Sequence, residues 1–225
     1  MNNFIIVRAL RKLGKLAGYR LDFTPMEISD DRKAKEEYFF RMTKRAAIFD
    51  GDFVECGLGN GFSFALLAKA AESAGKKIYG FDSFEGFPAP SESDLSRYKI
   101  KEGDWSDVEC KNVEDAVKKF VTEEYFQNSV KITPGFFSDS LPTVSLSSIS
   151  LLHLDVDLYQ SYIDCFEALF DKVVVGGIII IDEYLNGIEY AKYPGGYLAQ
   201  RDFLADKNVD ICRDFCTGKY FLVKR

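Results

Sequence analysis

Glu55 and the glycines that follow it are the first residues whose types and spacing suggest chemistry. Glu55 ends the short apolar run Phe53-Val54, and glycines stand at positions 57, 59 and 61. A strand that ends in a glycine turn and leads into a helix forms a crevice for a nucleotide-type ligand, because glycine lets the backbone turn tightly and approach the ligand closely. A carboxylate at this point would repel a pyrophosphate but suits a ligand that carries positive charge.

The glycine spacing argues against a dinucleotide site. The pattern G-x-G-x-x-G would place its third glycine at position 62, where this chain has Phe62. The order E-x-G-x-G-x-G instead resembles motif I of S-adenosylmethionine-dependent methyltransferases, whose ligand carries a sulfonium and an amino group. An ordinary strand, turn and helix without a ligand is the alternative interpretation.

Further acids stand where later strands are expected to end. They are Asp82 after 77–81, Asp155 and Asp157 after 149–154, and Asp182 and Glu183 after 178–181. Ligands of open parallel sheets bind beyond the carboxyl ends of the strands, so we expect these acids at one rim. Asp82 stands about 20 residues after the last glycine, the spacing at which an acid meets ribose hydroxyls. Its alternative role is to cap a turn or a helix.

Three of these acids, Asp155, Asp182 and Glu183, are not explained by such a cofactor. Converging carboxylates repel one another unless a cation is present, and oxygen ligands with open positions suit a hard ion such as Mg²⁺. His153 is the only histidine and stands two residues before Asp155, so it shares the same strand face. It is a candidate ligand or base, but a buried histidine with a local hydrogen-bond partner is the simpler interpretation.

The apolar pattern predicts the elements that must position these residues, in an α/β fold with helices on both faces of a mostly parallel sheet. We expect strands at 53–55, 77–82, 130–133, 149–154 and 178–181, with a final hairpin of 209–212 and 219–223 that makes the last strand antiparallel. We expect helices at 32–48, 64–71, 112–125, 159–171 and 188–205, and a turn at Gly176-Gly177. The polar stretch 89–110 is a candidate lid, in which Trp105 either stacks on a ligand or anchors the lid.

The length and composition limit the classes of protein to which this chain can belong. A chain of 225 residues fits one domain with an appendage, and we expect a helical cap over 1–50 and the main domain over 51–225. A net charge of −6 argues against nucleic-acid binding. The five cysteines are odd in number, which favours reduced thiols and a cytoplasmic location. No apolar run reaches membrane-spanning length, and no signal peptide is evident.

Residues 1–21 carry apolar residues at helical spacing with basic residues between them. Such a helix can lie on an anionic membrane surface, but packing on its own domain or on a partner subunit is favoured. A homo-oligomer is therefore one possibility that the sequence leaves open.

Several motifs in one order carry a resemblance to a known family. The glycine turn is followed by Phe81-Asp82-Ser83-Phe84-Glu85-Gly86-Phe87-Pro88, Pro134-Gly135-Phe136-Phe137, Leu154-Asp155-Val156-Asp157-Leu158-Tyr159-Gln160-Ser161, and Gly176-Gly177 to Asp182-Glu183-Tyr184. Over roughly residues 50–205 the chain resembles the macrocin O-methyltransferase (TylF) family. The resemblance implies a Rossmann-like seven-stranded methyltransferase sheet. It also implies Mg²⁺-dependent transfer of the methyl of S-adenosylmethionine to a hydroxyl of a sugar or a glycosylated small molecule.

The resemblance also implies roles for single residues. The metal ligands would be Asp155, Asp182 and residue 183, which is Asp in the family pattern and Glu183 here, and Asp155 would also be the base. The residues expected to contact the cofactor are Glu55, Gly57, Gly59, Ser63, Asp82, Ser83, Gly135 and Phe136.

Two other enzyme classes and a non-enzyme remain as rival interpretations. Catechol O-methyltransferases have a similar metal arrangement but a lysine base three residues after the first aspartate, where this chain has Leu158. A nicotinamide-dependent oxidoreductase is disfavoured by Phe62 and by the acids after the fourth and fifth strands. A non-catalytic binding module that keeps the fold is disfavoured by the same acids.

Overall fold

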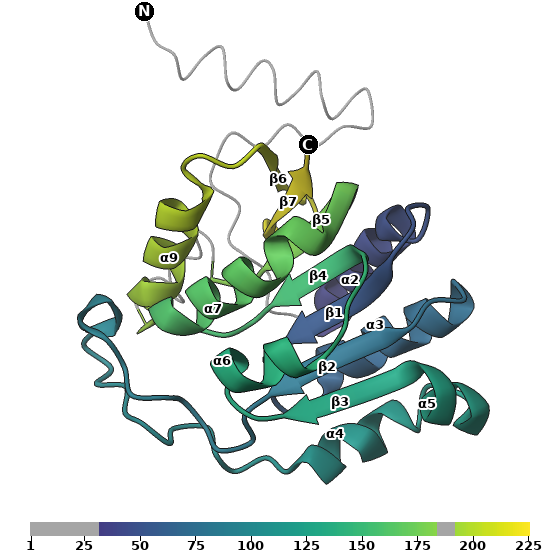
Figure 1. The fold of residues 1–225 in the computed structure, drawn as a ribbon, viewed down its shortest axis with the longest axis horizontal. Helices are drawn as coiled ribbons and strands as arrows, with labels where there is room; N and C mark the ends of the chain where they lie inside the picture. Colours follow the sequence, from purple (N-terminus) through teal and green to yellow (C-terminus); the bar gives the residue numbers. More distant parts are fainter. Residues whose placement is uncertain (1–31, 184–191) are drawn as a thin grey trace, which may run out of the picture.

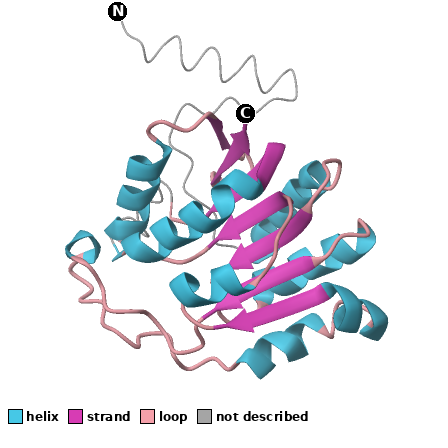
Figure 2. Cartoon of the chain, in the orientation of Figure 1, coloured by secondary structure: helices cyan, strands magenta, loops and turns pink. Residues whose placement is uncertain are grey.

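A mixed seven-stranded sheet forms the centre of the computed structural model, which describes residues 32–183 and 192–225 (Figures 1 and 2). The strands are β1 (Asp52–Cys56), β2 (Ile78–Asp82), β3 (Val130–Pro134), β4 (Ile149–Leu154), β5 (Val173–Ile181), β6 (Val209–Arg213) and β7 (Tyr220–Lys224). They lie in the order β3-β2-β1-β4-β5-β7-β6, and β7 is antiparallel to both of its neighbours. The expected fold class, with an antiparallel last strand, is confirmed.

Helices cover both faces of the sheet, and each face has its own apolar core (Figure 1). One core joins the sheet to α2 (Arg32–Ala46), α3 (Phe62–Ser73) and α4 (Cys110–Val117), with α5 (Glu123–Ser129) packed at its border. The other joins it to α6 (Phe137–Ser140), α7 (Tyr159–Leu169) and α9 (Pro194–Leu204). Because β4 is buried on both faces, Leu151 packs into the first core while Leu152 and Leu154 pack into the second.

Helix α2 belongs to the packed domain. Tyr38, Phe39, Met42 and Ala46 recur at helical spacing and are all buried in the first core, as the sequence pattern predicts. Residues 1–21, the basic amphipathic stretch, lie outside the described residues. The domain boundary at residue 50 stays a prediction.

Two local expectations were wrong. The stretch 112–125 is not one helix: α4 ends at Val117, and a new helix, α5, begins after Thr122, whose hydroxyl accepts a hydrogen bond from the Tyr125 backbone N–H. Gly176 and Gly177 do not form a turn before β5 but lie within it, where its register against β4 shifts. Gly176 has a φ of 84°, and a Cβ there would lie 2.4 Å from the Phe49 ring. Glycine at 176 thus lets Phe49 pack against the strand.

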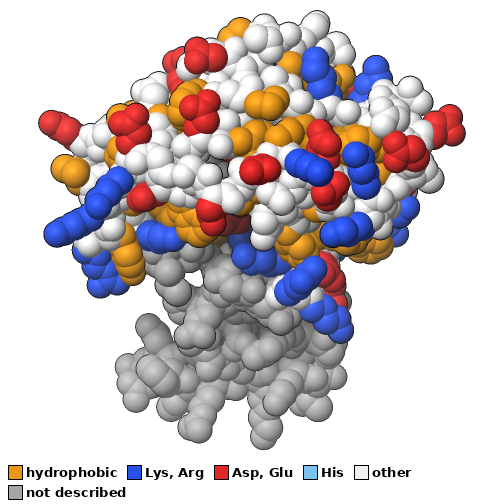
Figure 3. Space-filling model, turned by 90° about the horizontal axis from the view of Figure 1, so that it is seen from below, with side chains coloured by type: hydrophobic (Ala, Val, Ile, Leu, Met, Phe, Trp, Pro, Cys, Tyr) orange, Lys and Arg blue, Asp and Glu red, His pale blue; other side chains and the backbone are white. Residues whose placement is uncertain are grey.

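Three further observations bear on the expected class of protein. Within the described residues, no helix is long and apolar enough to cross a membrane. All five cysteines are free thiols. On the face shown in Figure 3, basic and acidic side chains of the described residues are interspersed, unlike the continuous basic stripe of nucleic-acid-binding domains.

Candidate active site

An open cleft of about 1470 Å³ lies beyond the carboxyl ends of β1, β2, β4 and β5. Pockets for one drug-sized ligand are typically about 300–1,000 Å³, so this cleft has room for a nucleoside cofactor and an acceptor together. Of the residues expected to bind the cofactor, six line the cleft: Gly57, Gly59, Ser63, Asp82, Ser83 and Phe136. The other two, Glu55 and Gly135, do not line it.

The glycine turn lies directly against the end of β4. Gly57 has a φ of 82°, and a Cβ there would lie 1.8 Å from the backbone oxygen of Asp155. Gly61 has a φ of 80° and precedes the first residue of α3. Glycine at 57 therefore brings the backbone of the glycine turn into contact with the residue expected to act as the base.

Asp82 holds the glycine turn against β2. Its Oδ2 accepts hydrogen bonds from the backbone N–H groups of Leu58 (2.7 Å) and Gly59 (3.2 Å), and its Oδ1 accepts one from Phe84 (2.9 Å). The turn-capping role given above as the alternative is therefore present. Ribose binding by Asp82 stays a prediction.

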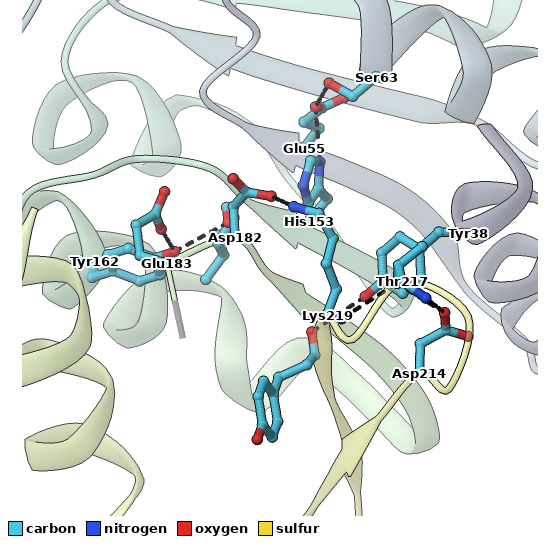
Figure 4. A network of polar contacts seen from close by, with 12 residues as sticks. Tyr38, Glu55, Ser63, His153, Tyr162, Asp182, Glu183, Asp214, Thr217 and Lys219 are labelled. Atoms are coloured by element: carbon cyan, nitrogen blue, oxygen red, sulfur yellow. Dashed lines mark hydrogen bonds and ion pairs between the residues drawn. The ribbon is translucent and has the colours of Figure 1, made fainter. Parts of the chain in front are cut away.

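Glu55 is fully buried and accepts two hydrogen bonds at one carboxylate oxygen (Figure 4). The Ser63 hydroxyl donates to Oε1 at 2.5 Å, and His153 Nδ1 lies 2.8 Å from the same atom. Burial alone would lower the pKa of His153, but the Glu55 carboxylate outweighs burial and raises it. The contact arises because Glu55 and His153 are direct partners across β1 and β4. The sequence does not reveal it, since strand register is needed to find it.

The acids after β4 and β5 form two groups that share Asp155. Ligand atoms of His153, Asp155 and Asp182 lie within 4.8 Å of one another, and so do those of Asp155, Asp157 and Glu183. No group contains both Asp182 and Glu183, because consecutive residues at a strand end point to opposite sides. The expected triad Asp155, Asp182 and Glu183 is therefore divided between the two groups.

Glu183 is buried on the side of α7. The Tyr162 hydroxyl donates a hydrogen bond to Glu183 Oε2. Burial, then the neighbouring Asp157 and Asp155 carboxylates, raises the pKa of Glu183 well above its ordinary value. Since Glu183 is also absent from the cleft wall, it is the most shielded of the three acids expected to bind metal.

Lys219 is the residue of this site that the sequence did not single out. It forms an ion pair with Asp182, which outweighs burial and lowers the pKa of that carboxyl (Figure 4). Among the described residues Asp155 forms no such ion pair, and burial together with the Asp182 carboxylate raises its pKa to about 7. Lys219 stands just before β7, far from the acids in sequence, and only the antiparallel pairing of β7 with β5 brings it here.

The stretch 89–110 is attached to the rest of the domain at several points. Trp105 Nε1 donates a hydrogen bond to the Tyr193 hydroxyl (3.1 Å), and the Tyr193 ring meets Phe87 edge-on. Buried Asp94 accepts a hydrogen bond from the Tyr159 backbone N–H at the start of α7 (2.8 Å). Trp105 therefore anchors the segment, one of its two expected roles. A lid motion stays a prediction.

A family comparison agrees with this architecture. The family model described as Macrocin-O-methyltransferase (TylF) matches residues 39–212. The chain belongs to this family.

The matches to curated relatives cover only part of this chain and part of each relative. Demethyldecarbamoylnovobiocin O-methyltransferase of Streptomyces niveus is 30% identical over 168 residues, which cover 73% of this chain and 64% of that protein. Mycinamicin III 3''-O-methyltransferase of Micromonospora griseorubida is 26% identical over 144 residues, 60% of this chain and 55% of that protein. The chain thus spans less than two thirds of the length of these curated relatives.

Solved structures support the fold. The O-methyltransferase NovP has a TM-score of 0.67 at 22% identity, covering 85% of this chain and 79% of its own. CalS11, a calicheamicin methyltransferase, has a TM-score of 0.74 at 18% identity, covering 97% of this chain and 90% of its own. At these identities the likeness shows the Rossmann-like fold alone.

Proposed function

We propose that this TylF-family protein transfers the methyl of S-adenosylmethionine to a hydroxyl of a sugar or a glycosylated small molecule, assisted by a divalent cation such as Mg²⁺. One observation carries the proposal: the glycine turn touches the backbone of Asp155, so a cofactor on the turn and an acceptor at this carboxylate are neighbours. The curated relatives, named as O-methyltransferases of novobiocin-type and mycinamicin-type compounds, support the reaction and the acceptor class.

In this proposal the cofactor lies along the carboxyl ends of β1 to β3. The glycine turn approaches its amino-acid part, with Ser63 and the buried Glu55 behind it. Asp82 and Ser83 face the ribose, and Gly135 and Phe136, after β3, border the adenine. The buried negative charge of Glu55 attracts the positively charged sulfonium and ammonium groups of the cofactor. The same charge would repel a pyrophosphate.

The acids after β4 and β5 fit a divalent cation, because several carboxylates converge there and the pKa of Asp155 is raised in its absence. Two pairs of acids would be available to the cation: Asp155 with Asp182, and Asp155 with Glu183. Such a cation lowers the pKa of a bound hydroxyl. Lys219, already paired with Asp182, reduces the charge that remains to be matched.

Asp155 is the base in this scheme. Its carboxylate takes the proton of the acceptor hydroxyl while the hydroxyl oxygen bonds to the methyl carbon. The bond from methyl to sulfur breaks, and its electron pair stays on sulfur to give S-adenosylhomocysteine.

The aromatic residues that line the cleft favour a sugar acceptor. Phe87, Trp105 and Tyr193 contact one another in the cleft wall, and Trp105 is 64% exposed. Aromatic faces offer apolar surfaces on which the C–H side of a sugar ring packs while its hydroxyls stay hydrogen-bonded. The acids line the same cleft, so a sugar packed on these rings would have a hydroxyl near Asp155.

A methyl-transfer assay tests the proposal, with S-adenosylmethionine and a panel of macrolide and aminocoumarin glycosides. An excess of chelator should abolish transfer, and added Mg²⁺ should restore it. Asp155→Asn should lose most activity while calorimetry still shows cofactor binding. Asp164→Asn is the matched control, since Asp164 also lines the cleft but bonds to Gln160 outside both acidic groups. Full activity in chelator, or a fully active Asp155→Asn variant, would leave proximity alone as the source of catalysis.

A further inference from the structure

His153 carries a buried nitrogen that the proposed reaction does not use. The side chain is 1% exposed, and Nδ1 is engaged with Glu55 at 2.8 Å. Nε2 has no hydrogen-bond partner among the described residues. Buried polar atoms are almost always hydrogen-bonded, so an unpartnered imidazole nitrogen indicates a missing partner.

Two carboxylates share a small volume with this histidine. A ring nitrogen of His153 and carboxylate oxygens of Asp155 and Asp182 all lie within 4.8 Å of one another. Since Nδ1 is held by Glu55, Nε2 is the nitrogen left for a shared ligand. Atoms that bind one cation at about 2.1 Å lie at most about 4.2 Å apart. The three atoms are therefore within a small adjustment of a coordination shell.

Glu55 orients the ring for this purpose. Figure 4 shows the His153 ring next to Glu55 and beside the Asp182–Lys219 pair. A histidine that binds metal through one nitrogen usually donates the N–H of the other to a carboxylate, which fixes the tautomer. The contact between His153 Nδ1 and Glu55 Oε1 has this form and leaves Nε2 as the nitrogen available to a metal ion.

We propose that His153 is a nitrogen ligand of the divalent cation in this cleft, so that the site prefers a first-row transition ion such as Mn²⁺ or Co²⁺ over Mg²⁺. The proposal rests on the proposed function for the presence of a cation, and it changes the ligand set and the ion. Mg²⁺ favours oxygen ligands alone, whereas imidazole nitrogen suits the later first-row ions, whose affinity for such sites rises from Mn²⁺ to Co²⁺.

Lys219 does not block this shell. Its ammonium contacts Oδ1 of Asp182, so Oδ2 is the oxygen left for the cation. The ion would thus have His153 Nε2, Asp155 and one oxygen of Asp182 as protein ligands. The remaining positions would be open to water or to acceptor hydroxyls.

The single histidine of the chain makes the ligand directly observable. The probe is Mn²⁺ alone, added to the full chain grown with ¹⁵N-labelled histidine, without cofactor or acceptor. Electron spin-echo spectroscopy should show modulation from a directly bound ¹⁵N nucleus. Bound Mn²⁺ without this coupling would overturn the histidine ligand and leave cation-assisted methyl transfer standing. No Mn²⁺ binding at all would overturn both.

A conservative variant gives a second measurement. His153→Asn keeps an amide N–H at the position of Nδ1 to face Glu55 but removes the distal nitrogen. Loss of one ligand should weaken Mn²⁺ and Co²⁺ binding by about 10- to 100-fold and Mg²⁺ binding much less. Asp164→Asn should change neither, and thermal unfolding checks that each variant is folded. A His153→Asn variant that keeps the full preference for Co²⁺ over Mg²⁺ would contradict the proposal.

Discussion

Lys219 forms a buried ion pair with Asp182 across the end of the sheet, where β5 ends and β7 begins. Lys219 is 5% exposed, and burial alone would lower its pKa, but Asp182 and then Asp155 raise it above the ordinary value. The ammonium is therefore charged at neutral pH. It is a fixed positive charge within a group of carboxylates, and it affects the affinity of the cleft for any ion.

Removing this charge should tighten the binding of divalent ions. Lys219→Met keeps the length and apolar stem of the side chain but removes the ammonium, which repels a divalent ion and occupies one oxygen of Asp182. Even with strong solvent screening, a unit charge a few ångströms from an ion changes affinity by about tenfold or more. Calorimetric titration with Mn²⁺ measures this change. Lys219→Arg retains the charge and is the control, and equal or weaker binding in Lys219→Met would contradict the prediction.

Asp155 gives the stability of the protein a particular pH dependence when divalent ions are absent. Its pKa of about 7 in the folded state exceeds the ordinary value of 3.8, so the folded protein holds this proton more tightly than the unfolded chain does. The corresponding stabilisation is complete below about pH 4 and is lost as the pH rises through about 7. Asp155→Asn, which carries no charge at any pH, should therefore be more stable than the parent at pH 8.

Thermal unfolding in chelator from pH 4 to pH 8 tests this prediction. The advantage of Asp155→Asn over the parent should grow with pH, and saturating Mn²⁺ should reverse it, because only the parent then has the carboxylate to bind the ion. Asp164→Asn, at another residue of the cleft wall, is the control for the substitution itself. A constant difference between Asp155→Asn and the parent across this range would refute the assignment.

Asp214 should have the opposite pH dependence. Arg41 on α2 donates to both of its oxygens, at 3.1 and 2.8 Å, and Thr217 donates to Oδ2. Burial alone would raise the pKa of Asp214, but these partners lower it. Its contribution to stability is thus present above the unfolded pKa and is lost as the pH falls.

This pair ties α2 to the turn between β6 and β7, so its loss should be measurable. Asp214→Ala leaves the Arg41 guanidinium without its partner and should lower the free energy of unfolding by about 3 kcal/mol at pH 7. Arg41→Met should cost less, because Asp214 then keeps the hydrogen bonds from the Cys216 and Thr217 backbone N–H groups and from the Thr217 hydroxyl. Denaturant unfolding of both variants and of the double variant measures the coupling. Purely additive losses would mean that the two residues act separately.

The ends of β4 and β5 could be predicted from the sequence because each strand is a largely apolar run that is followed directly by an acid. Asp155 therefore lies where expected, at the cleft. The side to which each acid points could not be predicted as well. Asp182 and Glu183 are consecutive at the end of β5 and fall into different groups, a consequence of strand geometry, and the expected metal triad stays a prediction.

Contacts between residues far apart in the sequence could not be predicted from sequence patterns. The His153–Glu55 contact depends on the register of β1 against β4, and the Lys219–Asp182 pair depends on that of β7 against β5. A shift of one residue in either register would turn the side chain to the opposite face. Lys219 was therefore not singled out in the sequence, and the Glu55 partner of His153 was not foreseen, although both contacts are central to the polar network of the cleft.

Asp82 has two candidate roles that a single substitution cannot separate. Its carboxylate accepts hydrogen bonds from three backbone N–H groups of the adjacent turns, and it faces the cleft where a ribose is proposed. Asp82→Ala should weaken S-adenosylmethionine binding by about 10- to 100-fold through the loss of charge-assisted hydrogen bonds. Loosening of the glycine turn alone would also weaken binding, so a second ligand is needed.

The ribose hydroxyls provide that second ligand. If Asp82 binds them, the parent should bind S-adenosylhomocysteine about tenfold or more tightly than its 2′-deoxy analogue, because the deoxy form lacks a hydroxyl that donates a charge-assisted hydrogen bond to the carboxylate. This preference should vanish in Asp82→Ala, whose residual affinity for both ligands would be equal. If Asp82 only holds the turn, the substitution should weaken both ligands by the same factor and leave the preference intact. Calorimetry on the four combinations of protein and ligand distinguishes the two results, and Asp164→Asn, at a cleft residue outside the proposed cofactor contacts, serves as the control.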